Sequence, residues 1–267
     1  MTEPLDQNIQ LRIDGPIARV TLNRSDRHNA FDDRVIAALS ACFDNLATNE
    51  TVRVVILAST GKSFSAGADL GWMKRSAGYR NAENEADARK LAEMLAKLNL
   101  LPKPTIALVQ GGAYGGGVGL VAACDIALAA EGAKFSLTET RLGLIPSVIS
   151  PYVLAAIGAR AARRYFLTAE FFDAAEAYRL GLVHSVVPAD ELTEAGDRLI
   201  KHLLDAAPGA VADAKRLIAD IAGRPIDDTI IGETARRIAN ARSSDEGREG
   251  ISAFLERRKP GWRLEKD

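Results

Sequence analysis

The chain of 267 residues has few of the residue types that mark disulfide-rich or metal-binding proteins: only two cysteines and three histidines. Cys42 and Cys124 form no C-x-x-C pair, and two cysteines in a chain of this length do not make a disulfide framework. His28, His184 and His202 lack metal-ligand spacing, so no metal is expected, and His184 is interpreted as a satisfied histidine at a strand edge. We expect both cysteines to be reduced core residues of a cytoplasmic protein.

Long hydrophobic runs and a dominant charge are also absent. The longest apolar region, 118–130, is interrupted by Asp125 and falls short of the roughly 20 residues of a membrane span. The N-terminal segment 1–10 is acidic and polar, unlike a signal peptide. The formal net charge of −1 provides no global positive field for nucleic acid or an anionic membrane. We therefore expect neither as a partner.

Hydrophobic periodicity predicts an α/β protein, because strand-like and helix-like runs alternate along the first part of the chain. The expected strands are 17–22, 52–58, 105–109, 126–129 and 134–137, and the expected helices are 33–46, 83–98 and 115–123. This order is typical of parallel strands with crossover helices. Beyond residue 192 only helices are expected, at 194–204, 210–221, 226–241 and 245–257. We divide the chain into an α/β core, 1–195, and a helical C-terminal region, 196–267.

Two motifs resemble nucleotide-binding sequences. The first lacks a required glycine, and the second lies in the wrong part of the chain. Gly61-Lys62-Ser63 resembles the end of a phosphate-binding loop, but position 56 is isoleucine where that motif requires glycine. The glycines at 117 and 119 fit a dinucleotide pattern, yet they lie mid-chain, after several strands, and precede a largely apolar helix. A G-x-S-x-G elbow is also missing, so a serine hydrolase has no support.

Two glycine-rich loops directly follow predicted strands. The first is SFSAGADL at 63–70, and the second is GGAYGGGVG at 111–119. Small residues let a ligand approach the backbone, and a helix that begins there presents unpaired N–H groups. Two N–H groups converging from two loops would form an oxyanion hole. One such loop by itself would indicate only a tight turn and close helix packing.

Together the two loops and their surroundings resemble the crotonase superfamily, also called the enoyl-CoA hydratase/isomerase superfamily, over nearly the whole chain. The matching segments are NR at 23–24, NAF at 29–31, FSAGADL at 64–70, GGAYGGG at 111–117, CD at 124–125, FSLTETRLGLIP at 135–146, AAEAYRLGLV at 174–183 and EGREGISAFLERRKP at 246–260. The resemblance implies a spiral of ββα units and a helical C-terminal region that packs trimers, often stacked as hexamers. Ile226, Ile230 and Ile231 suit such an interface, but equally suit packing onto the chain's own core.

The resemblance also implies a site for acyl-CoA thioesters. Its oxyanion donors would be the backbone N–H groups of Ala68 and Gly116, and its proton carrier Glu139. The expected CoA-binding residues are Arg27, His28, Ala66, Gly67, Ala68, Asp69, Leu70, Gly115 and Gly116, with Phe254 and Arg257 reaching the CoA of a neighbouring subunit. The expected acyl-pocket residues are Trp72, Met73, Tyr114, Pro146 and Ser147. CoA is part of the substrate, so no separate cofactor is expected. Without the resemblance, Phe254 would be interpreted as a core residue and Arg257 as part of a solvated helix end.

The chain departs from the family's hydratases in two places. They usually carry two glutamates on opposite sides of the double bond, and the first should stand at Gly119. The segment PSVISPY at 146–152 stands where many hydratases have a proline followed by a glycine-rich stretch. Together with GGGVGLVAACD at 115–125, it is similar to bacterial methylglutaconyl-CoA hydratases and their isohexenylglutaconyl relatives. That branch acts on branched substrates with a distal carboxylate. The residues considered for holding it are Arg141, Ser147, Ser150, Lys74 and Arg75.

We therefore predict a 2-enoyl-CoA hydratase, of the methylglutaconyl-CoA kind. A Δ3,Δ2-enoyl-CoA isomerase is the first alternative, because one carboxylate suffices to move a proton from C2 to C4. A thioester hydrolase is disfavoured, since such proteins carry Asp-Val-Gly-Gly where this chain has 147–150. A non-catalytic protein that binds CoA, or RNA, is the alternative of another class, although the net charge gives RNA binding no support.

Overall fold

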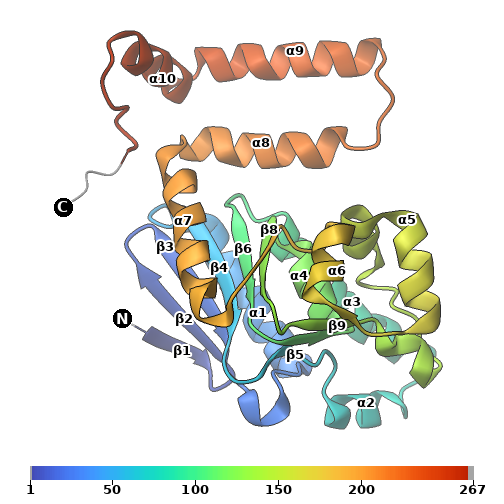
Figure 1. The fold of residues 1–267 in the computed structure, drawn as a ribbon. Helices are drawn as coiled ribbons and strands as arrows, with labels where there is room; N and C mark the ends of the chain where they lie inside the picture. Colours follow the sequence, from blue (N-terminus) through green and yellow to red (C-terminus); the bar gives the residue numbers. More distant parts are fainter. Residues whose placement is uncertain (1, 264–267) are drawn as a thin grey trace.

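The computed structural model describes residues 2–263, and its largest element is a seven-stranded sheet (Figure 1). The strand order is β1-β2-β3-β4-β6-β8-β11. The bounds are β1 Thr2–Asp6, β2 Ile9–Asp14, β3 Ile17–Leu22, β4 Val54–Ser59, β6 Thr105–Val109, β8 Ile126–Ala130 and β11 Ser185–Val187. The pairs β1–β2 and β2–β3 are antiparallel, and from β3 to β11 all pairs are parallel. The predicted parallel arrangement is confirmed.

A second sheet of four short strands has the order β10-β9-β7-β5. These strands are β5 Ser63–Ser65, β7 Gly112–Tyr114, β9 Lys134–Ser136 and β10 Phe172–Asp173. Each of β5, β7 and β9 directly follows a strand of the main sheet, and a helix comes after it. The chain thus repeats a ββα unit three times, which confirms the predicted spiral. Both glycine-rich loops lie where β5 or β7 leads into a helix.

Helices cover the sheet with apolar faces. Their bounds are α1 Asp33–Thr48, α2 Leu70–Ser76, α3 Asn81–Asn99, α4 Gly116–Ala123, α5 Ser150–Thr168 and α6 Ala174–Leu180, with short 3₁₀ turns η1 Ser25–Arg27, η2 Thr138–Leu142 and η3 Ala189–Glu191. In α1 the buried residues recur at three- and four-residue steps from Val35 to Leu46, so one face enters the core.

Three minor sequence predictions concern single side chains. Cys42 and Cys124 are free and buried, as expected, and burial raises the pKa of each thiol to about 12. His184 precedes β11, where its Nδ1 accepts a hydrogen bond of 3.1 Å from the N–H of Ala127. The interpretation of His184 as a satisfied histidine at a strand edge is confirmed.

The C-terminal region is helical, as predicted: α7 Leu192–Asp205, α8 Pro208–Ile221, α9 Asp228–Ser243 and α10 Asp245–Leu255. Helix α7 packs Leu192, Ala195 and Ile200 against the main sheet, whereas α9 and α10 extend beyond α8 (Figure 1). Residue 195 lies inside α7, and the division of the chain at that point stays a prediction. The termini of the two predicted regions, 1 and 264–267, lie outside the described residues. No helix among residues 2–263 is both long and apolar enough to cross a bilayer.

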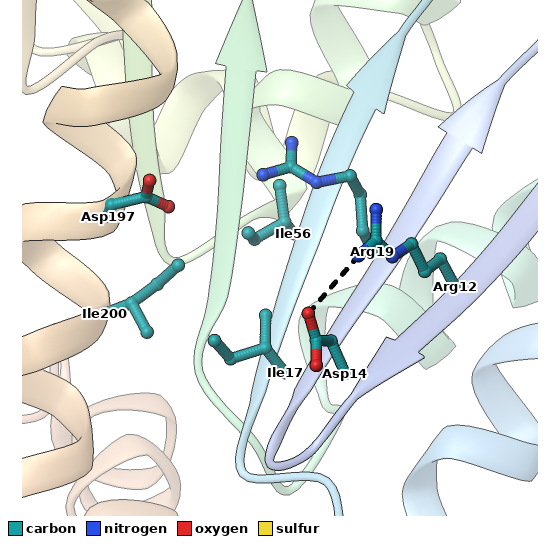
Figure 2. Close-up of a pocket in the computed structure, with 7 residues that line it drawn as sticks. All are labelled: Arg12, Asp14, Ile17, Arg19, Ile56, Asp197 and Ile200. Atoms are coloured by element: carbon teal, nitrogen blue, oxygen red, sulfur yellow. Dashed lines mark hydrogen bonds and ion pairs between the residues drawn. The ribbon is translucent and has the colours of Figure 1, made fainter. Parts of the chain in front are cut away.

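A cavity of about 180 Å³ lies between α7 and the strands β2, β3 and β4 (Figure 2). Its lining residues are Arg12, Asp14, Ile17, Arg19, Ile56, Asp197 and Ile200. Arg12 and Asp14 pair with each other at 3.4 Å along β2. Since the cavity is lined by no residue of either glycine-rich loop, we place the candidate site elsewhere.

Candidate functional site

The two glycine-rich loops meet backbone against backbone. A methyl group added to Gly67 would lie 2.6 Å from the carbonyl oxygen of Tyr114 and 3.2 Å from the nitrogen of Gly116. Gly67 also has a φ of 79°, which side chains disfavour. Glycine at 67 therefore allows the first loop to reach the start of α4.

Two backbone N–H groups at this contact have no acceptor. Within residues 2–263, the N–H groups of Ala68 and Gly116 donate no hydrogen bond. Their neighbours do: Gly67 donates to Ser65 Oγ at 3.2 Å, and Gly115 donates to the carbonyl of Ser136 at 2.9 Å. Gly116 is the first residue of α4, so its N–H lacks an intrahelical partner and lies at the positive end of the helix dipole. The contact thus offers two donors to an oxyanion.

The carboxylate of Glu139 lies beside these donors. Glu139 belongs to η2, directly after β9, and a methyl group added to Gly115 would lie 3.0 Å from its Oε1. Its Oε2 is buried and, among the described residues, accepts no hydrogen bond. Desolvation by burial raises the pKa of Glu139 above its ordinary value, opposed by a hydrogen bond from its own backbone. A carboxylate with a raised pKa and a free oxygen can both take and return a proton.

No side chain fits at position 119. A methyl group added to Gly119 would lie 2.9 Å from Cβ of Ile149 and still closer to its Cγ2. Ile149 is only 3 % exposed and precedes α5. The space in front of Gly119, where the resemblance implies the first glutamate of a hydratase, is therefore filled by an isoleucine.

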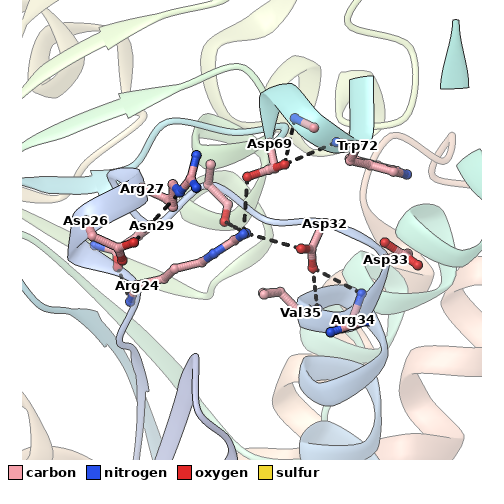
Figure 3. A network of polar contacts seen from close by, with 12 residues as sticks. Arg24, Asp26, Arg27, Asn29, Asp32, Asp33, Arg34, Val35, Asp69 and Trp72 are labelled. Atoms are coloured by element: carbon pink, nitrogen blue, oxygen red, sulfur yellow. Dashed lines mark hydrogen bonds and ion pairs between the residues drawn. The ribbon is translucent and has the colours of Figure 1, made fainter. Parts of the chain in front are cut away.

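A partly buried arginine holds the first loop in position (Figure 3). Arg24 forms ion pairs of 3.3 Å with both Asp32 and Asp69. Asp32 caps the N-terminus of α1, and Asp69 caps α2 by accepting hydrogen bonds from the N–H groups of Gly71 and Trp72. The carboxylate of Asp69 is thus occupied by the fold, and its backbone N–H and carbonyl are bonded to Phe31 and Met73. Its predicted contact with CoA stays a prediction.

The remaining residues predicted to bind CoA fall into two groups. Arg27 and His28 are exposed, and the carbonyl of His28 accepts a hydrogen bond of 2.9 Å from Ala66, so this loop lies alongside 66–70. Leu70 is 80 % exposed. Phe254 is 82 % exposed. Its helix α10 lies at the end of the C-terminal region that is far from α2 and β5 (Figure 1). One chain does not bring Phe254 and Arg257 to the site, and their reach into a neighbouring subunit stays a prediction.

The predicted acyl-pocket residues have mixed surroundings. Trp72 is buried, and its indole N–H donates a 2.7 Å hydrogen bond to Asp87 on α3. The ring of Tyr114 meets Phe171 edge to face, with centroids 5.6 Å apart. Pro146 is buried, Met73 half-buried and Ser147 exposed. Their role as a pocket stays a prediction.

Two of the residues considered for a distal carboxylate already have partners. Arg75 pairs with Asp33 at 2.6 Å, and the Ser150 hydroxyl donates to the carbonyl of Ser147. Lys74 and Ser147 are exposed. Arg141 lies two residues after Glu139, and its guanidinium stands 5.6 Å from the ring centre of Phe171. The contact recorded for the Arg141 guanidinium within residues 2–263 is this aromatic ring and not a carboxylate.

Comparison with known proteins shows the family of the chain. Residues 12–265 match the profile of the family described as enoyl-CoA hydratase/isomerase. The chain belongs to this family. A short-chain-enoyl-CoA hydratase of Clostridium acetobutylicum is 32 % identical over 94 % of this chain and 96 % of its own length. A mitochondrial delta(3,5)-delta(2,4)-dienoyl-CoA isomerase of Dictyostelium discoideum is 33 % identical over 91 % of this chain and 86 % of its own length.

The solved structures agree with the crotonase fold. An enoyl-CoA hydratase from Shewanella pealeana superposes with a TM-score of 0.94 at 45 % identity, covering 97 % of this chain and 98 % of that one. The predicted crotonase resemblance and fold class are confirmed. The family comprises both hydratases and isomerases, so membership establishes acyl-CoA double-bond chemistry at the level of the family.

Sequence reasoning missed two residues that shape the site. Arg24 was noted only as part of a matching segment, although an arginine preceding two aspartate caps is a readable signal for an ion-pair network. Ile149 was noted only within PSVISPY. Its contact with Gly119 depends on how the chain enters α5, and we see no sequence signal that gives it.

Proposed function

We propose that this family member hydrates the C2–C3 double bond of a 2-enoyl-CoA thioester. The observation that carries the proposal is the position of Glu139, whose Oε2 has no partner among the described residues, near the unpaired N–H groups of Ala68 and Gly116. The thioester carbonyl oxygen would accept hydrogen bonds from both. These bonds strengthen as the oxygen becomes an enolate, and such differential binding lowers the barrier.

One carboxylate can carry the whole proton cycle. Ionised Glu139 takes a proton from water while the water oxygen bonds to C3. The electron pair of the double bond moves toward the carbonyl, and the enolate oxygen is held by the two N–H groups. Protonated Glu139 then gives that proton to C2, so H and OH add from the same side. The raised pKa of Glu139 suits both steps.

We further propose a branched acyl group with a distal carboxylate, such as 3-methylglutaconyl-CoA. The support is the segment 146–152, which departs from the glycine-rich stretch of many hydratases, and Arg141, which lies two residues after Glu139. The hydratase names of relatives at 32 % and 45 % identity support hydration as the reaction.

Isomerisation of 3-enoyl-CoA to 2-enoyl-CoA is the second candidate. It is favoured by the contact between Gly119 and Ile149, because this reaction needs one carboxylate to move a proton from C2 to C4. The dienoyl-CoA isomerase among the relatives supports it.

A panel of thioesters separates these functions. Purified protein would be incubated with crotonyl-CoA, 3-methylglutaconyl-CoA and 3-hexenoyl-CoA, with Glu139→Gln as the control. Hydration of a 2-enoyl substrate, fastest for the branched one, is expected. Turnover of 3-hexenoyl-CoA alone would overturn hydration in favour of isomerisation. Release of free CoA would indicate a hydrolase, and binding without turnover of any substrate would indicate a non-catalytic protein.

We also propose that the chain assembles as a homotrimer or a dimer of trimers. The support is apolar surface on the tail, where Ile226, Ile231, Ile238, Phe254 and Leu255 are each at least half exposed. Ile230, in the same predicted stripe, is buried within the chain. Sedimentation equilibrium measures the mass directly, and a monomer at micromolar concentration would contradict the proposal.

A further inference from the structure

We infer that Ile149 is a specificity-determining residue, whose side chain fills the space in front of Gly119 and leaves Glu139 as the only proton-carrying carboxylate of the site. This inference rests on the proposed function of Glu139. The inference goes beyond that function, because it assigns a role in specificity to Ile149, whose side chain is apolar.

The first support is the position of the two glycines on α4. Gly116 and Gly119 are three residues apart, so they lie on the same face of the helix. Gly116 supplies the free N–H, and its predecessor Gly115 contacts Glu139. A methyl group added to Gly116 would meet the buried ring of Phe31, as one added to Gly119 would meet Ile149, so apolar side chains cover both glycines. A side chain at 119 would project one turn further along α4 than the donor N–H of Gly116.

The second support is that the Ile149 side chain cannot easily move aside to make room for a side chain at position 119. A methyl group at 119 would collide with Cβ and Cγ2, which lie at the base of the isoleucine side chain. Isoleucine is β-branched, so its χ1 has few alternatives. The carbonyl of Ile149 accepts a 3.1 Å hydrogen bond from Val153 in the first turn of α5, which fixes its backbone. Its side chain is 97 % buried in the core, since only 3 % is exposed.

The third support is that Ile149 and Glu139 border the same helix from connected elements. The turn η2, which carries Glu139, is tied to α5 by a 3.1 Å hydrogen bond from the Thr140 hydroxyl to the carbonyl of Phe166. Ile149 directly precedes α5. The α4 face is thus flanked by a carboxylate at Gly115 and by an apolar wall at Gly119, so the wall offers no group to hold or activate a second water.

The decisive experiment compares two double variants that differ only in charge: Gly119→Glu/Ile149→Gly and Gly119→Gln/Ile149→Gly. Both remove the isoleucine and place a side chain of equal length at 119. The glutamate variant is expected to hydrate a 2-enoyl-CoA at least ~10-fold faster than the glutamine variant, a threshold set below the roughly 10²–10⁴-fold that a positioned acid or base contributes. Its pH–rate profile should also contain a further ionisation that the glutamine variant lacks. Equal rates and identical profiles would overturn the inference.

Single variants provide the second measurement if either double variant fails to fold. Ile149→Ala opens the space over Gly119, whereas Val153→Ala makes a comparable cavity one turn along α5, in the same core. Both should lower the melting temperature. Only Ile149→Ala is expected to change the ratio of 2-enoyl hydration to 3-enoyl isomerisation, by about threefold or more. The same ratio in both variants would contradict a role in specificity.

The outcomes distinguish this inference from the proposed function. A wild-type protein inactive on every 2-enoyl and 3-enoyl thioester would overturn the proposed function. An active wild type with indistinguishable glutamate and glutamine double variants would overturn only the role of Ile149.

Discussion

The carboxylate of Glu139 reaches the start of α4 because position 115 has no side chain: a methyl group there would stand 3.0 Å from Oε1. Gly115 also adopts a φ of 50°, which is uncommon for residues with a side chain. At the same turn, the N–H of Gly116 meets no acceptor from residues 2–263. Gly116 and Glu139, 139 − 116 = 23 positions apart in sequence, thereby combine an oxyanion donor with a proton carrier.

Replacing Glu139 by glutamine should abolish turnover while preserving CoA binding. Glutamine is nearly isosteric but cannot accept and return a proton, and loss of such a group costs about 10²–10⁴-fold in rate. Stopped-flow or steady-state kinetics would give kcat, and calorimetry with an acyl-CoA product would give the affinity of the variant for that product. Turnover within tenfold of wild type would show that the proton carrier lies elsewhere.

Activity should fall on the acid side with an apparent pKa above that of an ordinary carboxyl group. Burial raises the pKa of Glu139, and the ionised form is the one that takes a proton from water. The kcat/KM of the free enzyme, measured between pH 4 and 9, should therefore decline through a pKa clearly above about 4.3, the unperturbed value for glutamate. An acid limb at the unperturbed value would contradict a desolvated base.

The glutamine variant should also be more stable than the wild type at neutral and alkaline pH. Because the folded pKa of Glu139 is raised, the folded state binds this proton more tightly than the unfolded chain. The stability of the wild type therefore falls as the pH rises through the folded pKa. Removing the unpaired buried Oε2 charge should raise the free energy of unfolding by about 1–2 kcal/mol at pH 8. Urea titrations at pH 8 and pH 4 test the sign, since the gain should vanish at the lower pH.

Much of the fold follows from periodicity, because long apolar runs and amphipathic stripes report burial directly. The strand at 105–109 and the helices α1, α3 and α4 lie within two residues of their predicted bounds. The three-residue strands β5 and β7 were predicted as loops. Such short strands form because they pair with each other. The two segments are far apart in the sequence, so neither segment's own residues indicate the pairing. Strand β2 was missed although Ile9, Leu11 and Ile13 alternate with polar residues.

For the candidate site, too, some features could be predicted from the sequence and others could not. Glycine-rich loops and a matching glutamate are visible in the sequence, and the resemblance assigned their roles. The direction of a backbone N–H is set by how two loops pack, as at Gly67 against Tyr114, and no residue type encodes it. The same holds for the orphan Oε2 of Glu139, which depends on what the surrounding elements leave uncovered.

The contact between the two glycine-rich loops should tolerate no methyl group. Gly67→Ala combines a φ of 79° with a collision against the backbone carbonyl of Tyr114. Gly143 is the matched control, because its φ is 72° and nothing lies within 4 Å of an added methyl. Gly143→Ala should cost about 1–2 kcal/mol from backbone strain alone, and Gly67→Ala about 1–3 kcal/mol more from overpacking. Equal losses in thermal unfolding would mean that the loops separate without cost.

Arg24 should matter for stability because it is shared by two helix caps. Arg24→Met would leave Asp32 and Asp69 without their common cation, with side chains only 14 % and 11 % exposed. We expect a loss of about 2–3 kcal/mol, below the value for a fully buried pair because all three groups retain some contact with water. Arg12→Met is the matched control: its ion pair with Asp14 has a similar length, 3.4 Å, but both side chains are more than half exposed. That change should stay within about 0.5 kcal/mol. A loss in Arg24→Met no larger than in Arg12→Met would show that the two caps hold the first loop without the arginine.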